Sequence, residues 1–341
     1  MRREEYLHTL TEQIRCKMAR GTIEQEINDH IEDQKAEFLS EGMSQTEGKD
    51  AGSETTEAGS SSTESTFTSE SILSAEQSTN ENGTVNTSAK ETKTLVVGAT
   101  TSPHAIILKH VKKEFEKQGY KLEIKEFSDY PQIDPSTTDG SLDANYFQHQ
   151  PYLTSYNKDA KLKKGDDGYL VSAGKIHFEP MGIYAGKSND LDNIPDGAQV
   201  AIPNDASNEA RALLLLKDKG LITLDDSVKV TSTNVTLKQV TSNPHNLDIV
   251  EMDGAQIASK LPDVDFGIIN GNYALDAKVT DSLLASEASD GEVANTYGNV
   301  IAVKESNKNN KAVKALVKIL KSDKTKEWIK TKFKGSVLPV E

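Results

Sequence analysis

The sequence predicts an α/β fold with two lobes, each built around a sheet of the parallel type. Two observations indicate it: a strand, helix, strand order over residues 95–127, and a second series of the same kind after Lys187. Such an order favours parallel strands joined by right-handed crossovers. A third observation limits the fold, because only 35% of the 341 residues are hydrophobic, which is low for a uniformly packed chain. We therefore expect both lobes to lie within residues 94–341.

The first lobe begins with a short apolar run and continues with a helical period. Residues 95–98 have the composition of a buried strand, and residues 105–118 repeat apolar side chains at helical spacing up to Gly119. Residues 121–127 then alternate apolar and polar side chains, as a strand does. Far along the chain, residues 310–333 have the period of one long helix.

The second lobe is predicted from five alternating segments. Strand, helix, strand, helix and strand are expected at residues 199–202, 208–219, 228–231, 254–260 and 266–269. Because ligands of such folds bind beyond the carboxyl ends of parallel strands, we expect a binding cleft between the two lobes.

Residues 1–47 are predicted to form a helical hairpin. Apolar side chains recur at helical spacing on both sides of Gly21, and Thr22 with Gln25 has the pattern of a capping box. In EEYLHTLTEQIRCK and INDHIEDQKAEFLSEGMS the hairpin resembles the small helical prefix domain found ahead of bacterial permease segments. Two short helices bury little surface, so the hairpin is expected to need a partner.

Residues 48–93 are predicted to be a flexible linker. They are rich in Ser, Thr, Glu, Gly and Asn and have almost no large apolar side chains. Such a segment cannot bury enough surface to offset the entropy lost on ordering.

Charge and cysteine content exclude several classes of protein. The formal net charge of -14 and the pI near 5.1 argue against nucleic acid or anionic lipid as a partner. The single cysteine, Cys16, excludes an internal disulfide framework and a site with several cysteine ligands. Arg15 precedes it where a lipidation site requires a small residue, and no apolar run lies before it, so lipidation at Cys16 is not expected.

The sequence contains no run of roughly 20 apolar residues that could span a bilayer, and its first residues lack the apolar core of a signal peptide. No Gly-x-Ser-x-Gly elbow or comparable nucleophile motif is present. We therefore expect a binding protein and not an enzyme, with no cofactor.

The segment DANYFQHQPYL, Asp143 to Leu153, has the composition of one wall of a ligand pocket. It places aromatic and imidazole rings beside amide groups, and Pro151 interrupts regular structure. A pocket of this composition holds a small ligand with one apolar and one polar end.

Six segments together resemble the NlpA/MetQ family of methionine-binding lipoproteins, which serve ABC importers. In order along the chain they are LVVGATTSPHA, DANYFQHQPYL, HFEPMGIYAGK, VAIPNDASNEARALLLL, FGIINGNYA and YGNVIAVKE. The resemblance implies a type II periplasmic-binding-protein fold, with a hinge of two segments. Lobe 1 would comprise residues 94–180 and 300–341, and lobe 2 residues 181–299. Two segments, near 177–184 and near 300–303, would cross between them.

The resemblance also implies the residues of the site. Arg211 would bind a carboxylate through its planar guanidinium, early in a helix. Asn270 and Asn299 would fix the polar head of the ligand, with Asn208 and Asn272 as weaker candidates. The rings of Tyr130, Phe147, His149, Tyr152 and His177 would form the wall for an apolar side chain, which a thioether fits well.

Some positions depart from the family or remain open. Ile106 stands where a glutamate commonly follows the Pro-His-Ala turn, and His104 is interpreted as a residue of a helix start. For the ligand's ammonium group, Glu179 and Asp205 are both possible partners, although Asp205 better suits a helix cap.

The expected function is capture of L-methionine by lobe closure and delivery to a methionine-type ABC permease and its ATPase. The expected place is the cell surface or the periplasmic face of the membrane. One alternative keeps the fold but changes the ligand to a methionine-containing dipeptide or another apolar amino acid. Another class of function is a metal-binding surface protein that uses His149, His177 and a nearby carboxylate. Removal of residues 1–93 is expected to leave binding unchanged.

Overall fold

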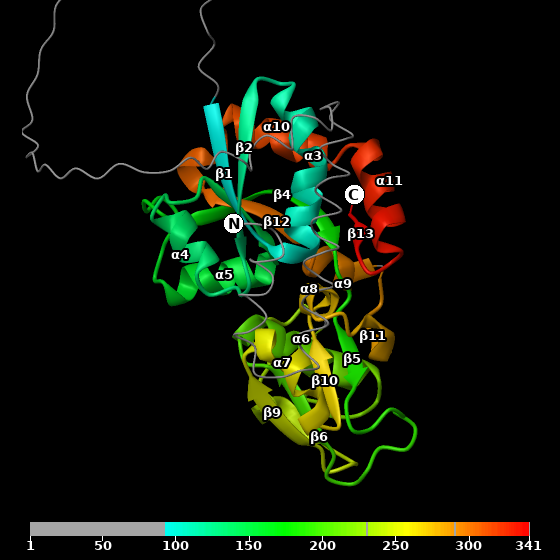
Figure 1. Ribbon diagram of the computed structural model, residues 1–341. Coiled ribbons are helices and arrows are strands. Elements are labelled where there is room, and N and C mark those ends of the chain that lie inside the picture. Colours follow the sequence, from blue (N-terminus) through cyan, green and yellow to red (C-terminus); the bar gives the residue numbers. More distant parts are fainter. Residues whose placement is uncertain (1–92, 230, 290, 341) are drawn as a thin grey trace, which may run out of the picture. The chain divides into compact units, whose positions relative to one another are not determined.

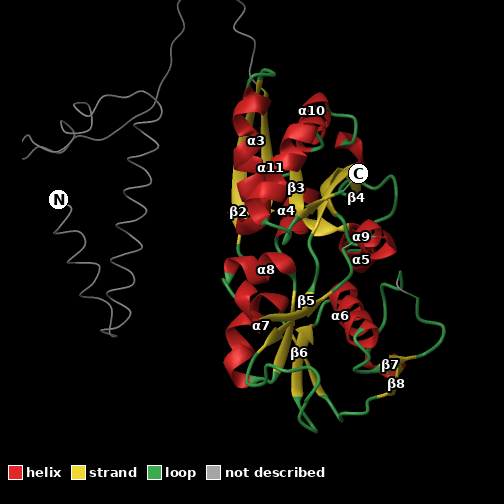
Figure 2. Cartoon of the chain, turned by 90° about the vertical axis from the view of Figure 1, so that its right-hand side faces the viewer, coloured by secondary structure: helices red, strands yellow, loops and turns green. Residues whose placement is uncertain are grey.

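The computed structural model describes residues 93–229, 231–289 and 291–340. The predicted hairpin (1–47), Cys16 and all but the last residue of the predicted linker (48–93) lie outside these ranges. The described chain forms two sheets, each in its own lobe (Figures 1 and 2).

The first sheet has the strand order β13-β4-β12-β3-β1-β2. Its strands are β1 (Lys93–Thr100), β2 (Tyr120–Phe127), β3 (Ala144–His149), β4 (Leu170–Phe178), β12 (Asn299–Lys304) and β13 (Leu338–Pro339). Strand β1 is parallel to β2 and β3, as predicted, whereas β12 is antiparallel to both β3 and β4.

Helices cover both faces of this sheet (Figure 1). They are α3 (Ile106–Glu116), α4 (Ile133–Thr138), α5 (Gln150–Asp159), α10 (Lys311–Leu320) and α11 (Asp323–Phe333). Side chains alternate along β12, so Ile301 packs with α3, α10 and α11 in the largest core, while Val300 packs with Leu153 of α5.

The second sheet has the strand order β11-β5-β10-β6-β9. Its strands are β5 (Gly182–Ala185), β6 (Gln199–Pro203), β9 (Asp248–Met252), β10 (Phe266–Ile269) and β11 (Leu283–Ser286). Strand β6 is parallel to β9 and β10, whereas β5 is antiparallel to β10 and β11. A small separate hairpin consists of β7 (Thr223–Leu224) and β8 (Val240–Ser242).

The helices of the second lobe are α6 (Ala206–Asp218), α7 (Gly254–Lys260) and α8 (Gly271–Asp276), and α9 (Gly291–Thr296) lies on the segment that returns to the first lobe. In Figure 2, α6 and α7 lie on opposite sides of the sheet. The alternation along β6 explains this, because Val200 and Ile202 pack in the core of α6, whereas Ala201 packs with Ile257 of α7. Short helical turns occupy residues 101–105, 237–239, 261–263, 280–282 and 305–307.

Two segments connect the lobes. Residues 179–181 lead from β4 to β5, and residues 287–298 lead from β11 to β12. The second crossing therefore precedes the predicted one, because residues 300–303 already belong to β12. The strand that follows each crossing, β5 in the second lobe and β12 in the first, runs antiparallel to the neighbouring strand β10 or β3. Both sheets are therefore mixed and not purely parallel.

The predicted two-lobed α/β fold is confirmed, and two further local predictions are wrong. Residues 228, 229 and 231 are not in a strand, and β9 occupies the place beside β6. The predicted helix over 310–333 is two helices, because Ser322 accepts a hydrogen bond from the Thr325 backbone N–H and begins α11. Among the described helices, none combines the length and apolar character needed to span a membrane.

Candidate ligand-binding site

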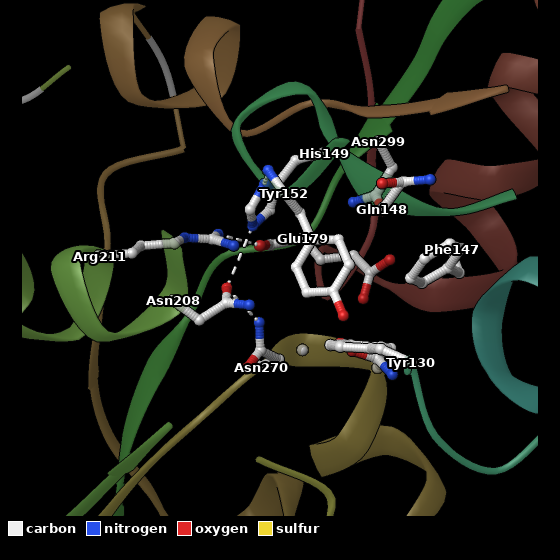
Figure 3. Close-up of a pocket in the computed structure, with 12 residues that line it drawn as sticks. Tyr130, Phe147, Gln148, His149, Tyr152, Glu179, Asn208, Arg211, Asn270 and Asn299 are labelled. Atoms are coloured by element: carbon white, nitrogen blue, oxygen red, sulfur yellow. Dashed lines mark hydrogen bonds between the residues drawn. The ribbon is translucent and has the colours of Figure 1, made fainter. Parts of the chain in front are cut away.

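A cavity lies between the lobes (Figure 3). Its first-lobe lining comes from the loop before α4, from the end of β3, from α5 and from β12. Its second-lobe lining comes from the crossing after β4 and from the first residues of α6 and α8. The lining residues are Tyr130, Phe147, Gln148, His149, Tyr152, Glu179, Asn208, Arg211, Asn270, Gly271, Asn272 and Asn299.

Aromatic rings form one side of the cavity. The ring centroids of Tyr130 and Phe147 lie 5.4 Å apart, and each lies 5.6 Å from that of Tyr152. Tyr130 also stacks on Tyr273 of α8, with centroids 4.6 Å apart, and its hydroxyl donates a hydrogen bond to Asn272. These contacts join the two lobes, so the structure has them closed on each other.

His149 is a neutral donor at the junction of β3 and α5. Its Nδ1 accepts a hydrogen bond from the Tyr152 backbone N–H (3.2 Å) and caps α5. The other ring nitrogen, Nε2, therefore donates to Asn208 Oδ1 at 3.1 Å. Burial, and then the charge of Arg211, lower the pKa of His149 to about 3, so the ring is uncharged near pH 7.

Asp205, Asn208 and Asn270 form a chain of hydrogen bonds on the second-lobe side of the cavity. Asp205 caps α6 and accepts hydrogen bonds from Asn208 Nδ2 at 3.0 and 2.9 Å. Because that nitrogen is used, Asn208 Oδ1 faces the other way and accepts from Asn270 Nδ2 at 2.9 Å. Asp205 thus acts as a cap and an orienting group and does not line the cavity.

Arg211 is buried and already paired. Its Nε donates to Glu287 Oε1 at 2.8 Å, and its Nη2 donates to Glu287 Oε2 and to the Glu179 backbone oxygen, each at 2.7 Å. The guanidinium also lies 4.6 Å from the ring centroid of Tyr297. No hydrogen bond among the described residues uses Nη1, so this nitrogen is available to a ligand in the cavity.

Glu179 lies on the first crossing, where it joins two buried histidines. Its Oε1 lies 2.6 Å from His177 Nε2 and 3.3 Å from His104 Nε2. Burial lowers the pKa of His104 to about 4 and that of His177 to about 3, and burial raises the pKa of Glu179. His104 therefore belongs to the site's surroundings and is more than a residue of a helix start.

Several buried polar atoms of lining residues have no hydrogen-bond partner in the described part of the protein. They are Gln148 Oε1, Asn270 Oδ1 and Asn272 Nδ2. Gln148 Nε2 donates to Asp134 Oδ1 at 2.5 Å, and Gln148 Oε1 is left without a partner among the described residues. Because native interiors rarely leave polar groups unpaired, these atoms indicate a polar ligand.

The structure brings together the predicted site residues with one exception. His177 does not line the cavity, because its ring nitrogens contact the Tyr146 hydroxyl and Glu179, and of these residues only Glu179 reaches the cavity. Arg211, Asn270 and Asn299 line it, as do the weaker candidates Asn208 and Asn272 and the remaining predicted rings, Tyr130, Phe147, His149 and Tyr152.

Sequence reasoning missed Gln148, Gly271 and Glu287. Gln148 belongs to the DANYFQHQPYL segment, where amides beside rings were the available signal. Gly271 and Glu287 carried no local signal, because their roles depend on contacts with Glu179 and Arg211, far away in the sequence.

The metal site considered from the sequence does not assemble as expected. Within the described ranges, one group of three potential ligands lies close enough to share an ion: His104, His177 and Glu179. His149 is not part of it and donates to Asn208 instead.

The profile of one protein family, described as NlpA lipoprotein, matches residues 95–341. The chain belongs to the NlpA lipoprotein family. This confirms the resemblance found in the six sequence segments. The NlpA family is one of substrate-binding proteins, so the expectation of a non-enzymatic protein is also confirmed.

Individual NlpA relatives agree over nearly their whole length. The chain is 38% identical over 252 residues to the methionine-binding lipoprotein MetQ of Bacillus subtilis (strain 168), covering 73% of this chain and 88% of the relative. A solved structure from Ruminococcus gnavus has 47% identity and a TM-score of 0.68, covering 73% of this chain and all of the other. A nutrient binding protein from Burkholderia cenocepacia, solved bound to methionine, has 40% identity and a TM-score of 0.66, covering 72% and 100%.

Proposed function

We propose that this protein captures L-methionine between its lobes and delivers it to an ABC importer. The observation that carries the proposal is the division of the cavity: Arg211 reaches in from one side, and Tyr130 and Phe147 lie on the other (Figure 3). An amino acid with an apolar side chain has the same division. The methionine bound by the Burkholderia cenocepacia relative supports this choice of ligand.

The carboxylate of the ligand would meet Arg211 Nη1, the nitrogen that neither Glu287 nor Glu179 uses. Asn272 Nδ2, which has no hydrogen-bond partner among the described residues, is a further donor in the cavity lining. The thioether would lie among Tyr130, Phe147 and Tyr152, where each contact between sulfur and ring contributes roughly 0.3 to 1.5 kcal/mol.

Lobe closure would be the mechanism of capture, and no bond is made or broken. Tyr130 of the first lobe bonds Asn272 of the second, and His149 bonds Asn208 across the same boundary. A ligand that contacts both lobes would stabilise this closed form over an open one. The partner would be a methionine-type permease, to which this protein would dock on the extracytoplasmic face of the membrane, as family membership suggests. The ATPase would be part of the same importer.

Isothermal titration against a panel of ligands tests the proposal. The panel comprises L-methionine, D-methionine, glycyl-methionine, leucine and glutamine, and mass spectrometry of the denatured protein would detect ligand that copurifies. We expect the tightest binding for L-methionine. No methionine binding by titration and no methionine in the denatured protein would refute the proposal. Tighter binding of the dipeptide or of leucine would favour the same fold with another ligand.

A further inference from the structure

The charged groups that line the cavity are few. Among the described lining residues, Arg211 is the one guanidinium and Glu179 the one carboxylate. Arg211 is neutralised by Glu287 at 2.7 and 2.8 Å, so Glu179 is the charge that no cationic side chain pairs directly. A buried carboxylate without a cation is costly, which makes it a candidate for a cationic group on the ligand.

Two histidines hold one oxygen of this carboxylate. The Thr100 hydroxyl lies 2.6 Å from His104 Nδ1, and the Tyr146 hydroxyl is hydrogen-bonded to His177 Nδ1. Because the Nε2 atoms face oxygens that only accept, each neutral ring carries its proton on Nε2, and its Nδ1 accepts from the hydroxyl. His177 Nε2 donates to Glu179 Oε1 at 2.6 Å, and His104 Nε2 lies 3.1 Å from Asn299 Oδ1 and 3.3 Å from Glu179 Oε1.

The second oxygen lies on the cavity side. A Cβ added to Gly271, which lines the cavity, would come within 3.2 Å of Glu179 Oε2 and 2.9 Å of Glu179 Cβ. The absence of a side chain at Gly271 therefore gives the carboxylate its room. The histidines thus contact Glu179 through Oε1, the Asn272 backbone N–H also donates to the carboxylate, and Oε2 lies beside Gly271 in the cavity lining.

We propose that Glu179 binds the ammonium group of the ligand, and that His104 and His177 are positioning residues that orient its carboxylate. The inference rests on the proposed function and sharpens it: the site selects ligands with a free, protonated α-amino group. N-acylated amino acids and the corresponding 2-keto, 2-hydroxy and deaminated acids are rejected, because they leave the buried carboxylate unpaired.

The full-length protein is titrated with L-methionine and with 4-methylthiobutanoate, which is methionine without its amino group. The unaltered protein is expected to favour methionine by roughly 30-fold or more, as for a buried charge pair. In Glu179→Gln this ratio falls towards one, chiefly because methionine binds less tightly. Glu114→Gln, an exposed glutamate on α3, is the matched control and keeps the ratio. An unchanged ratio in Glu179→Gln overturns the assignment.

The histidines are tested by the same ratio. His177→Phe fills the space without a donor and is expected to lower the ratio by about tenfold, whereas His177→Gln supplies an amide N–H and restores most of it. General loss of stability would weaken both ligands alike and leave the ratio unchanged. His104→Phe tests the same point from the other side of the carboxylate if His177→Phe does not fold. A ratio that both phenylalanine variants preserve overturns the positioning role.

A metal titration separates this inference from its nearest rival. Metal-free protein is titrated with zinc chloride, and we expect no stoichiometric binding. One tight zinc ion per chain that is lost in Glu179→Gln would overturn the inference, because Glu179 would then be a metal ligand.

If the unaltered protein binds no methionine at all, the proposed function fails and this inference with it. If methionine binds but the ratio of the two affinities is the same in Glu179→Gln as in the unaltered protein, only this inference fails.

Discussion

Arg211 and Glu287 form a two-point ion pair at the edge of the ligand cavity, with Nε 2.8 Å from Oε1 and Nη2 2.7 Å from Oε2. The side chains are only 3% and 7% exposed. From the sequence, Arg211 was expected to bind the carboxylate of the ligand. The structure gives it a second role, because it also neutralises the buried carboxylate of Glu287, which joins the two crossings by accepting from the Met181 backbone N–H.

Arg211→Ala is therefore expected to abolish methionine binding and also to lower the free energy of unfolding by about 3–5 kcal/mol, since Glu287 would stay buried without a partner. Urea unfolding followed by circular dichroism measures the stability, and calorimetric titration measures the binding. The double variant Arg211→Met with Glu287→Leu is expected to recover most of the stability and none of the binding. A single variant as stable as the unaltered protein would contradict the role of the pair.

Tyr130→Phe is expected to weaken ligand binding by up to about tenfold, because it removes one hydrogen bond between the lobes and leaves Asn272 Oδ1 without its donor. The stacking of ring 130 on Tyr273 is kept, so the lobes still close. The loss should appear mainly as faster ligand dissociation, measured by stopped-flow fluorescence. Tyr120→Phe, which stacks on Phe115 away from the cavity, is the control. Equal dissociation rates for both variants would show that the bond does not hold the lobes together.

Local patterns predicted most of the fold, and their failures have physical reasons. The alternation around Val228 resembles a strand, but local alternation does not determine which segment reaches the sheet edge, and Asp248–Met252 pairs with β6 instead. The break before α11 carried a signal that could have been used, because Ser322 followed by Asp323 is a typical helix start.

The site was predictable where the evidence was local. Phe147, His149 and Tyr152 come from one segment and line one cavity. His177 was wrongly assigned to the cavity. It lies two residues from Glu179 on an extended segment, so both side chains point to the same side, but His177 contacts Glu179 and only Glu179 reaches the cavity. The pairing of Arg211 with Glu287 spans 76 positions, and no single-sequence pattern indicates it.

The buried Asp134 is expected to make stability depend on pH. Burial raises its pKa from 3.8 to about 7, so the unfolded chain releases this proton at lower pH than the native state does. The native state is therefore progressively destabilised between about pH 4 and 7, by up to about 4 kcal/mol. Asp134→Asn keeps an oxygen for Asn145 and Gln148 and removes the charge.

The gain in unfolding free energy of Asp134→Asn should thus be small at pH 4 and largest at pH 8, as measured by urea unfolding across this range. Taking the difference from the unaltered protein cancels the contribution of His104, His149 and His177, whose lowered pKa values act in the opposite direction. A pH-independent difference would mean that Asp134 has an ordinary pKa.

Deletion of residues 1–92 is expected to leave the affinity for methionine unchanged. The cavity lining runs from Tyr130 to Asn299, and the deletion keeps β1 whole from Lys93. Calorimetric titration of the truncated and full-length chains makes the comparison. A loss of affinity beyond about threefold, roughly 0.65 kcal/mol, would assign the first 92 residues to the binding unit.

Gly271→Ala tests the position of the Glu179 side chain without changing a charge. The added Cβ would lie 2.9 Å from Glu179 Cβ and 3.2 Å from its Oε2, so the carboxylate must move, and methionine affinity is expected to fall about tenfold or more. Stability is expected to fall as well, because the Glu179 Cβ lies next to the backbone and has little freedom to move away from the added methyl group. Gly254→Ala, at the first residue of α7, is the matched control, since its Cβ would meet nothing closer than 3.4 Å.

In a Glu179→Gln background the loss of affinity caused by Gly271→Ala should shrink to a few-fold, because the interaction it disturbs is already gone. A full loss in that background would place the effect of Gly271 on some other ligand contact.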